Sequence, residues 1–396
     1  MIAVEEATSI ILSHVVSPEV EEVGFNDALN RVLMEDVYAD RDFPPFNRVM
    51  MDGIAIDSHE WEKGRREYTI EGIQTAGSPQ AVLSDSKNCL EVMTGAMLPQ
   101  GTDVVIRYED VTVEGKKALI DLEEIKVLQN IHLKGTDRKA GDVLMSKSQV
   151  LSPAEIAVLA TVGKSKVKVA KHLRIAIVST GDELVDIEDT PNPYQIRKSN
   201  VYALGAALAD LRHKTNIFHI KDEKQVLTSE LKVILAEHDV VILSGGVSKG
   251  KKDYVPEVLS SLGVEKYFHG VKQRPGKPFW FGKHNSGTAV FALPGNPVST
   301  FMCFYKYVVA YLNASYGKKG KQAKAKLAAP FSFAPELSYF LQVKVVYAGG
   351  ELQAEPVVGR GSGDLANLLE ADAFLELPPD RAQFEAGEVF PLYTYR

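Results

Sequence analysis

Residues 240–254 read VVILSGGVSKGKKDY, and the interpretation of the whole chain starts from this stretch. Its first four residues form a short aliphatic run, which is typical of a buried parallel strand. The run breaks at Ser244 into a glycine-rich segment, as strands do where they lead into a loop that surrounds phosphate. We therefore expect a ligand site in the loop that follows residue 243.

The neighbouring segments alternate between strand and helix patterns. We expect strands at 174–179, 215–220 and 239–244 and helices at 200–212 and 223–237. This order predicts a doubly wound α/β/α domain with a parallel sheet covered on both faces. Ligands bind such sheets at the carboxyl ends of the strands. Two further candidate segments lie there, Ser-Thr-Gly-Asp-Glu at 179–183 and Leu-Pro-Gly-Asn-Pro at 293–297, where Asn296 suits the N-cap of a helix.

The remaining segments predict smaller units. Residues 4–16 and 152–161 have helical patterns, the second with a capping box from Ser152 to Glu155, and we expect these two helices to pack together. Short alternating runs between 68 and 144 predict a β-rich insertion. The predicted domains are a helical linker domain (1–40 plus 145–170), an inserted β-rich domain (41–144), an α/β domain (171–322) and a small C-terminal β domain (323–396).

The overall composition argues against several classes of partner. The 396-residue chain has a formal charge of −7, which disfavours broad attraction to nucleic acid or to an anionic membrane. It has two cysteines and no signal-peptide pattern at Met1, so we expect a cytoplasmic protein without disulfides. Between 246 and 277, however, the sequence contains seven basic residues and three acidic ones. A basic site in an acidic protein suggests a small anionic ligand.

Residues 245–251 fit the pattern GxxxxGK of a P-loop, but position 252 is lysine. A P-loop needs Ser or Thr there to hold Mg²⁺, so this pattern argues against an NTPase. Asp182, Glu183 and Asp253 could bind Mg²⁺ on ligand phosphates, or could be ordinary turn and helix-start acids. Lys272, Arg274 and Lys277 flank the rigid Pro-Gly turn at 275–276, which favours anion binding over a solvated charge run.

Six motifs, taken in order, resemble one family over nearly the whole chain. They are PPF at 44–46 with MDG at 51–53, MTG at 93–95, STGDEL at 179–184, SGGVS at 244–248 with DY at 253–254, PGKP at 275–278 and LPGNP at 293–297. This set resembles the MoeA-type molybdopterin molybdenumtransferases, which include the E domain of gephyrin. The resemblance implies a MogA-like α/β domain that binds molybdopterin, within an elongated homodimer whose active site lies near the dimer interface.

The resemblance also implies the chemistry. Such an enzyme inserts molybdate into adenylylated molybdopterin and releases AMP with Mg²⁺ as cofactor, in transient contact with the adenylyltransferase that supplies its substrate. By motif, the catalytic residues would be Asp52, Thr94, Glu183, Asp253 and Lys277, with Asp182, Glu183 and Asp253 serving the metal. The substrate would be bound by Thr180, Gly181, Asp222, Ser244, Gly245, Gly246, Ser248, Lys272, Arg274, Pro294 and Ser362.

Some positions depart from the family pattern, and two other functions stay open. Val49, Ile54, His132, Thr136 and Lys198 stand where other residues are usual, and the segment FLQV at 340–343 lacks an arginine common in the last domain. One alternative is adenylylation of molybdopterin by a MogA-type domain, and the other is a non-catalytic, gephyrin-like scaffold. The flanking domains favour insertion, and the retained Asp182, Glu183, Asp253 and Lys277 argue against a scaffold. The sequence does not distinguish molybdate from tungstate.

Overall fold

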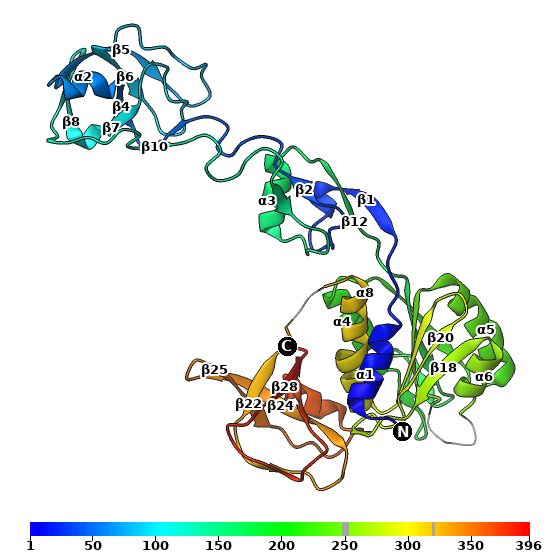
Figure 1. The fold of residues 1–396 in the computed structure, drawn as a ribbon. Helices are drawn as coiled ribbons and strands as arrows, with labels where there is room; N and C mark the ends of the chain where they lie inside the picture. Colours follow the sequence, from blue (N-terminus) through cyan, green and yellow to red (C-terminus); the bar gives the residue numbers. More distant parts are fainter. Residues whose placement is uncertain (248–252, 319–320) are drawn as a thin grey trace.

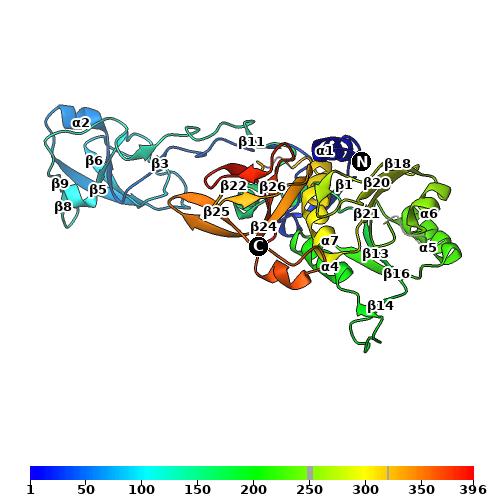
Figure 2. The ribbon, with the colours of Figure 1, turned by 90° about the horizontal axis from the view of Figure 1, so that it is seen from below.

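The computed structural model describes residues 1–247, 253–318 and 321–396 of an elongated molecule. The β-rich domain lies at one end, and the α/β and C-terminal domains lie at the other (Figure 1). A second view, turned by 90°, shows the same separation (Figure 2). In the described part of the chain, no helix combines the length and the apolar character that crossing a bilayer requires.

The α/β domain is built on a mixed sheet with the order β16-β13-β17-β21-β20-β18. Its strands are β13 (Ile175–Thr180), β16 (Thr215–Ile220), β17 (Val240–Ser244), β18 (Val264–His269), β20 (Trp280–His284) and β21 (Ala289–Leu293). The three strands expected from the sequence, β13, β16 and β17, pair in parallel as predicted, and β21 pairs in parallel with β17. The sheet is mixed because β20 pairs antiparallel with both β21 and β18. A tight turn joins β20 to β21, and so short a connection permits only antiparallel pairing.

Helices cover both faces of this sheet, as its alternating apolar residues require. Ile177 on β13 packs with α4 (Asn200–Asp210), and the neighbouring Val178 packs with α5 (Lys224–Glu237) and α6 (Val255–Ser261). Both side chains are fully buried. Since successive side chains of a strand point to opposite faces, the sheet separates two hydrophobic cores. This fulfils the expected doubly wound arrangement.

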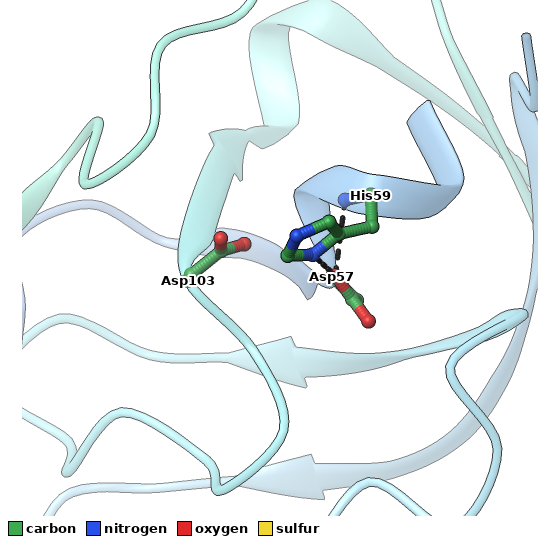
Figure 3. Close-up of side chains that lie close together, drawn as sticks. All are labelled: Asp57, His59 and Asp103. Atoms are coloured by element: carbon green, nitrogen blue, oxygen red, sulfur yellow. Dashed lines mark hydrogen bonds and ion pairs between the residues drawn. The ribbon is translucent and has the colours of Figure 1, made fainter. Parts of the chain in front are cut away.

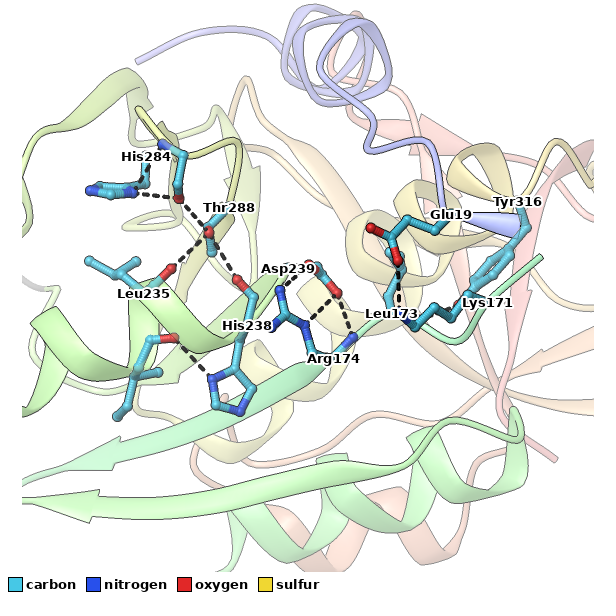
Figure 4. Close-up of polar contacts among 12 residues, drawn as sticks. Glu19, Lys171, Leu173, Arg174, Leu235, His238, Asp239, His284, Thr288 and Tyr316 are labelled. Carbon is cyan, nitrogen blue, oxygen red and sulfur yellow. Dashed lines mark hydrogen bonds and ion pairs between the residues drawn. The ribbon is translucent and has the colours of Figure 1, made fainter. Parts of the chain in front are cut away.

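Polar contacts close the amino-terminal edge of the sheet, where the linker segments enter and leave (Figure 4). Asp239 accepts from the backbone nitrogen and the guanidinium of Arg174, each at 2.8 Å. The ammonium of Lys171 donates to Glu19 at 2.7 Å, which ties the two linker strands together. These contacts occupy this edge and leave the carboxyl ends of the strands as the open edge.

The first helix, α1 (Val4–Ser13), packs on the α/β domain. Its buried residues Val4, Ala7 and Ile11 belong to the same core as α8 (Val309–Ser315). The expectation that it packs beside α3 (Pro153–Thr161) is therefore wrong, because α3 contacts η1 (Phe25–Asp27) in a separate core. The capping box of Ser152 and Glu155 is present as predicted. Strand pairs β1 (Val20–Gly24) with β12 (Lys166–Ala170), and β2 (Val37–Tyr38) with β11 (Val143–Met145), join the two flanks of the insertion.

The β-rich domain contains a sheet with the order β7-β4-β6-β5-β9-β8. Its elements are β4 (Gly53–Ile56), α2 (Ser58–Glu62), β5 (Glu67–Gln74), β6 (Asn88–Val92), β7 (Val104–Arg107), η2 (Tyr108–Asp110), β8 (Val111–Glu114) and β9 (Lys117–Ile120). The short strands β3 (Arg48–Val49) and β10 (Ile131–His132) pair beside it. Asp52 precedes β4 directly, so the rigid sheet fixes its position.

The C-terminal domain is a small closed sheet with the order β19-β24-β25-β22-β28-β26, in which β26 also pairs with β24. Its elements are β22 (Lys324–Leu327), β23 (Phe331–Ser332), β24 (Ser338–Ala348), β25 (Glu351–Pro356), η4 (Leu365–Leu369), β26 (Ala373–Leu377), β27 (Gln383–Phe384) and β28 (Val389–Thr394). Strand β19 (Gln273–Arg274) comes from the α/β domain and pairs with β24. The segment that carries Arg274 is thus shared by both domains.

Candidate active site

The carboxyl ends of β13, β17 and β21 lie side by side at the open edge of the sheet. Ser179 pairs in register with Ser244, and Ser244 pairs with Leu293. The backbone nitrogen of Gly245 also donates to the carbonyl of Leu293 at 3.2 Å. The three predicted ligand-binding segments therefore meet at one edge, as expected for an open α/β sheet. The predicted site residue Ser248 lies outside the described residues.

The loop after β17 needs glycine at two positions, because neighbouring segments lie too close to its backbone for a side chain. A Cβ atom at Gly245 would lie 2.8 Å from the carbonyl oxygen of Thr180, and one at Gly246 would lie 2.6 Å from a methyl group of Val255. Both glycines have positive φ, 103° and 69°, which side chains oppose. The hydroxyl of Thr180 is buried beside them and has no hydrogen-bond partner within the described parts of the chain. Since buried polar groups are rarely left unpaired, this hydroxyl is available to a ligand.

Asn200, at the start of α4, is a site residue that sequence reasoning did not select. Its amide nitrogen donates to the hydroxyl of Ser244 at 2.9 Å and to the carbonyl of Gly295 at 2.8 Å. One side chain thus joins the ends of β17 and β21. The signal in the sequence is a polar residue at the first position of a predicted helix, since helices of an α/β sheet that follow a strand begin near the carboxyl ends of the strands.

The predicted metal-binding carboxylates lie along the same edge. Asp182 accepts from the backbone nitrogen of Asp222 at 3.2 Å, so the loops after β13 and β16 are in contact. Gly181, with a φ of 141°, leaves room for Glu183, because a Cβ there would lie 2.7 Å from its carboxylate. Asp253 precedes α6 on the neighbouring loop. Carboxylate oxygens suit Mg²⁺, which usually takes one or two of them together with substrate phosphates and water.

A different group, Asp57, His59 and Asp103, brings its ligand atoms within 4.8 Å of one another among the described residues (Figure 3). Its carboxylates already hold the first turn of α2. Asp57 accepts from the backbone nitrogen of His59 at 3.0 Å, and Asp103 accepts from the nitrogen of Ser58 at 2.8 Å. This group lies at the end of β4 opposite to Asp52. Helix capping accounts for its geometry.

A basic cavity of about 450 Å³ lies between the α/β and C-terminal domains. Arg274 and Lys277 line it from one domain, and Ser362 lines it from the other. Of the described residues that line this cavity, none is acidic. Asn296 donates to the hydroxyl of Ser362 at 2.9 Å, so it occupies the N-cap position of α7 (Pro297–Cys303) without capping through its side chain. Pro294 also lines the cavity, which therefore adjoins the open edge of the sheet.

Buried contacts hold the loop that carries Arg274 and Lys277. Gln273 is fully buried, and its amide nitrogen donates to the carbonyl of Gly276 at 3.0 Å. The hydroxyl of Tyr307 donates to the amide oxygen of Gln273. Gly276 has a φ of 90°, and a Cβ there would lie 2.6 Å from the sulfur of Cys303. The two cationic residues therefore stand on a loop fixed tightly against α7 and the helical turn that follows it.

The structure separates Lys272 from Arg274 and Lys277. Lys272 lines another cavity, of about 580 Å³, together with Glu5 and Arg381. The reason is the backbone, because the nitrogen of Lys272 donates to the carbonyl of Ile2 at 2.8 Å on the side of α1. The expected group of three cations is thus reduced to two in the interdomain cavity. A role for Lys272 in binding substrate stays a prediction.

Asp52 and Thr94 form a pair in the β-rich domain. The carboxylate of Asp52 accepts from the backbone nitrogen of Thr94 at 2.6 Å and from its hydroxyl at 2.7 Å. These hydrogen bonds stabilise the charged form and lower the pKa of Asp52. The β-rich domain lies at the far end of the molecule from the α/β domain (Figure 1), to which Lys277 belongs. One chain alone therefore does not bring the two predicted groups of catalytic residues together.

Comparisons with known proteins match this architecture along the chain. Residues 2–163 match the MoeA N-terminal region (domain I and II), residues 176–314 a probable molybdopterin-binding domain and residues 324–395 the MoeA C-terminal region (domain IV). A molybdopterin molybdenumtransferase of Synechocystis sp. is 41% identical over 399 residues, covering 100% of both chains. The chain belongs to the MoeA family. This confirms the family predicted from the six motifs.

Other members of the MoeA family support the same assignment. A molybdopterin molybdenumtransferase of Staphylococcus epidermidis is 32% identical over 400 residues, covering 98% of this chain and 94% of that one. A crystal structure of the molybdopterin biosynthesis MoeA protein from Pyrococcus horikosii has a TM-score of 0.84 at 32% identity, covering 100% of this chain and 99% of that one. The predicted multidomain fold class is thereby confirmed.

The positions that depart from the MoeA pattern have local partners of their own. Val49 is buried and pairs with Ile131, and Ile54 is buried in the sheet of the β-rich domain. His132 is 2.9 Å from the carboxylate of Asp137. The hydroxyl of Thr136 donates to the carbonyl of Leu133. The ammonium of Lys198 donates to Asp186. Hydrogen bonds from Lys198 and Tyr202 lower the pKa of Asp186 to about 2. These substitutions thus occupy self-contained clusters.

Proposed function

We propose that this protein is a molybdopterin molybdenumtransferase that inserts molybdate into adenylylated molybdopterin and releases AMP with the help of Mg²⁺. Full-length relatives that carry this enzyme name are 41% and 32% identical to it. The observation that carries the proposal is the cavity lined by Arg274, Lys277 and Ser362, without acidic lining residues among those described. Such a cavity suits a tetrahedral dianion.

The open edge beside this cavity suits the other half of the substrate. The glycine loop at Gly245 and Gly246 permits close backbone approach, and the buried hydroxyl of Thr180 has no partner among the described residues. Both features fit a phosphate-containing ligand at the carboxyl ends of the strands. We propose that adenylylated molybdopterin lies here, with its dithiolene directed toward the anion held by Arg274 and Lys277. Asp222, which contacts Asp182, would border the same ligand.

We assign Asp182, Glu183 and Asp253 to the metal, because they belong to the loops after β13 and β17 at this edge. Mg²⁺ bound there would neutralise charge on the phosphoanhydride as AMP leaves. The protein side chains would bind and position the oxyanion. Lys277 and Arg274 hold the oxyanion, and the fixed turn at Pro275 and Gly276 keeps them in place without further ordering of the loop.

We further propose that the site is completed by a second copy of the chain. Asp52 and Thr94 are joined by two hydrogen bonds and exposed at the far end of the molecule. Met50 and Met51 beside them are 51% and 37% exposed, so two apolar side chains adjoin the pair. A homodimer that places Asp52 and Thr94 over the partner's cavity would complete the active site and cover the two methionines.

The direct test supplies purified protein with adenylylated molybdopterin, molybdate and Mg²⁺. We expect release of AMP and formation of active cofactor, and loss of both when EDTA removes the metal. A parallel reaction contains molybdopterin and ATP. If the protein adenylylates molybdopterin there and leaves the adenylylated substrate intact, the MogA-type alternative is correct. If the folded protein does neither, a scaffold function is correct.

A further inference from the structure

The C-terminal wall of the interdomain cavity contains a buried amide without a partner. Gln342, on β24, lines the cavity and is 8% exposed. Its amide nitrogen is buried and has no hydrogen-bond partner among the residues that the structure describes. A buried amide left unpaired costs free energy, because it has lost its hydrogen bonds to water without replacing them. The position of Gln342 at the cavity wall indicates that this donor is kept for a bound ligand.

Arg360 brings a positive charge to the same wall. It lies in the loop between β25 and η4 and lines the cavity. Its backbone nitrogen donates to Asp364 at 3.0 Å. Within the described part of the chain, no hydrogen bond or ion pair engages its guanidinium. The guanidinium is therefore free to bind an anion in the cavity.

Together with the opposite wall, these residues surround the cavity with donors. Arg274 and Lys277 approach from the α/β domain, and Gln342, Arg360 and Ser362 approach from the C-terminal domain. Three positive charges and no lining carboxylate among the described residues suit an anion with two negative charges. Arg360 supplies its charge from the loop between β25 and η4.

We propose that Gln342 and Arg360 are the residues of the C-terminal domain that recognise the tetrahedral oxyanion. The Gln342 amide donates to one oxygen, and the Arg360 guanidinium donates to others. This rests on the proposed function, which makes the anion molybdate. Both residues set the affinity for the oxyanion, while the pterin and its phosphates are bound at the open edge of the sheet.

The test measures molybdate binding to the full-length protein by calorimetry, for wild type, Gln342→Leu and Arg360→Gln. Each variant should raise the Kd by about tenfold or more, since hydrogen bonds to charged groups are among the stronger ones. Gln342→Leu should also keep or raise the melting temperature, because an apolar group replaces an unpaired buried amide. A purely structural role of Gln342 predicts the opposite pair of results.

Two variants serve as controls in the same sheet. Gln353→Leu changes a partly buried glutamine on β25, and Lys344→Gln removes an exposed charge from β24. Neither residue lines the cavity, so both variants should bind molybdate as wild type does. The inference is overturned if Gln342→Leu and Arg360→Gln also bind with wild-type affinity, or if wild type binds no molybdate.

A second readout separates this inference from the proposed function. In the AMP-release assay, the two variants should raise the KM for molybdate and leave the KM for adenylylated molybdopterin unchanged. Wild-type protein that binds molybdate but releases no AMP would contradict the proposed function and leave the anion site intact. Wild-type turnover with unchanged KM for molybdate in both variants would contradict the anion site alone.

Discussion

Asp52, which we propose as a catalytic residue, is held by hydrogen bonds in the absence of any substrate. Its carboxylate accepts two hydrogen bonds from Thr94, at 2.6 and 2.7 Å. These bonds favour the ionised form, so the pKa of Asp52 is lowered from its ordinary value near 3.8. The carboxylate therefore stays charged, as an acceptor or a base, throughout the physiological pH range.

Replacing Thr94 by valine tests this arrangement. The hydroxyl hydrogen bond disappears while the backbone one can remain, so the pKa of Asp52 should rise toward its ordinary value. A lowered carboxyl pKa means that the charged form is lost only as the pH falls through the lowered value. The variant should therefore lose that charge at a higher pH than wild type does. An NMR titration of the Asp52 side-chain carbon measures both midpoints, and equal midpoints would contradict the prediction.

At the scale of elements, one helical turn connects the two walls of the cavity. The π-helical turn η3 (Phe304–Val308) follows α7, and its Tyr307 donates to Gln273 below the Arg274 loop. The preceding residue, Lys306, donates to Glu376 at 2.8 Å and to Tyr393 at 2.6 Å in the C-terminal domain. Burial and the neighbouring Glu376 raise the pKa of Tyr393. This turn therefore fixes the α/β domain to the C-terminal domain.

Lys306→Met should destabilise the protein strongly. Lys306 is 8% exposed, and its loss leaves the buried carboxylate of Glu376 without a counter-charge. Removing one partner of a buried ion pair costs about 3–5 kcal/mol. Chemical denaturation measures the loss. Lys324→Met, at an exposed position of β22, is the matched control. Equal stabilities of the two variants would contradict a connecting role, and adding Glu376→Gln to Lys306→Met should recover part of the loss.

Local signals in the sequence predicted the elements well. The capping box at Ser152 predicts the start of α3, and the residues of β16 lie at 215–220 as expected. Packing between elements was less predictable. The apolar stripe of α1 fits any apolar surface, and its choice of α8 over α3 depends on the tertiary fold.

The same limit applies to the site. Motifs predicted the meeting of the 179–183, 244–247 and 293–297 segments, because parallel strand ends share an edge. The separation of Lys272 from Arg274 depends on a backbone contact with Ile2, and the place of Gln342 at the wall of the interdomain cavity depends on how the two domains pack. Neither contact leaves a pattern in the local sequence.

At the scale of the whole molecule, the separation of Asp52 from Lys277 predicts sites shared between subunits. Asp52→Asn and Lys277→Met should each be inactive as pure homodimers. Hybrids that combine one chain of each kind, purified through different tags, should regain activity, because one of the two sites of the dimer is then intact. Activity is measured as AMP release.

The control for this experiment is a chain that carries both substitutions, paired with a wild-type chain. In that hybrid each shared site contains one substitution, so it should be inactive. Sites contained within one chain predict the reverse, with the second hybrid active and the first inactive. The two hybrids together therefore decide between a shared site and a self-contained one.

The most direct test of the proposed function follows a single turnover with enzyme in excess over adenylylated molybdopterin. AMP and inserted molybdenum are measured in the same samples, for wild type and Lys277→Met. We predict that wild type releases one AMP for each molybdenum inserted, and that Lys277→Met slows both together. Release of AMP without inserted molybdenum, or inserted molybdenum while the adenylylated substrate stays intact, would contradict the account.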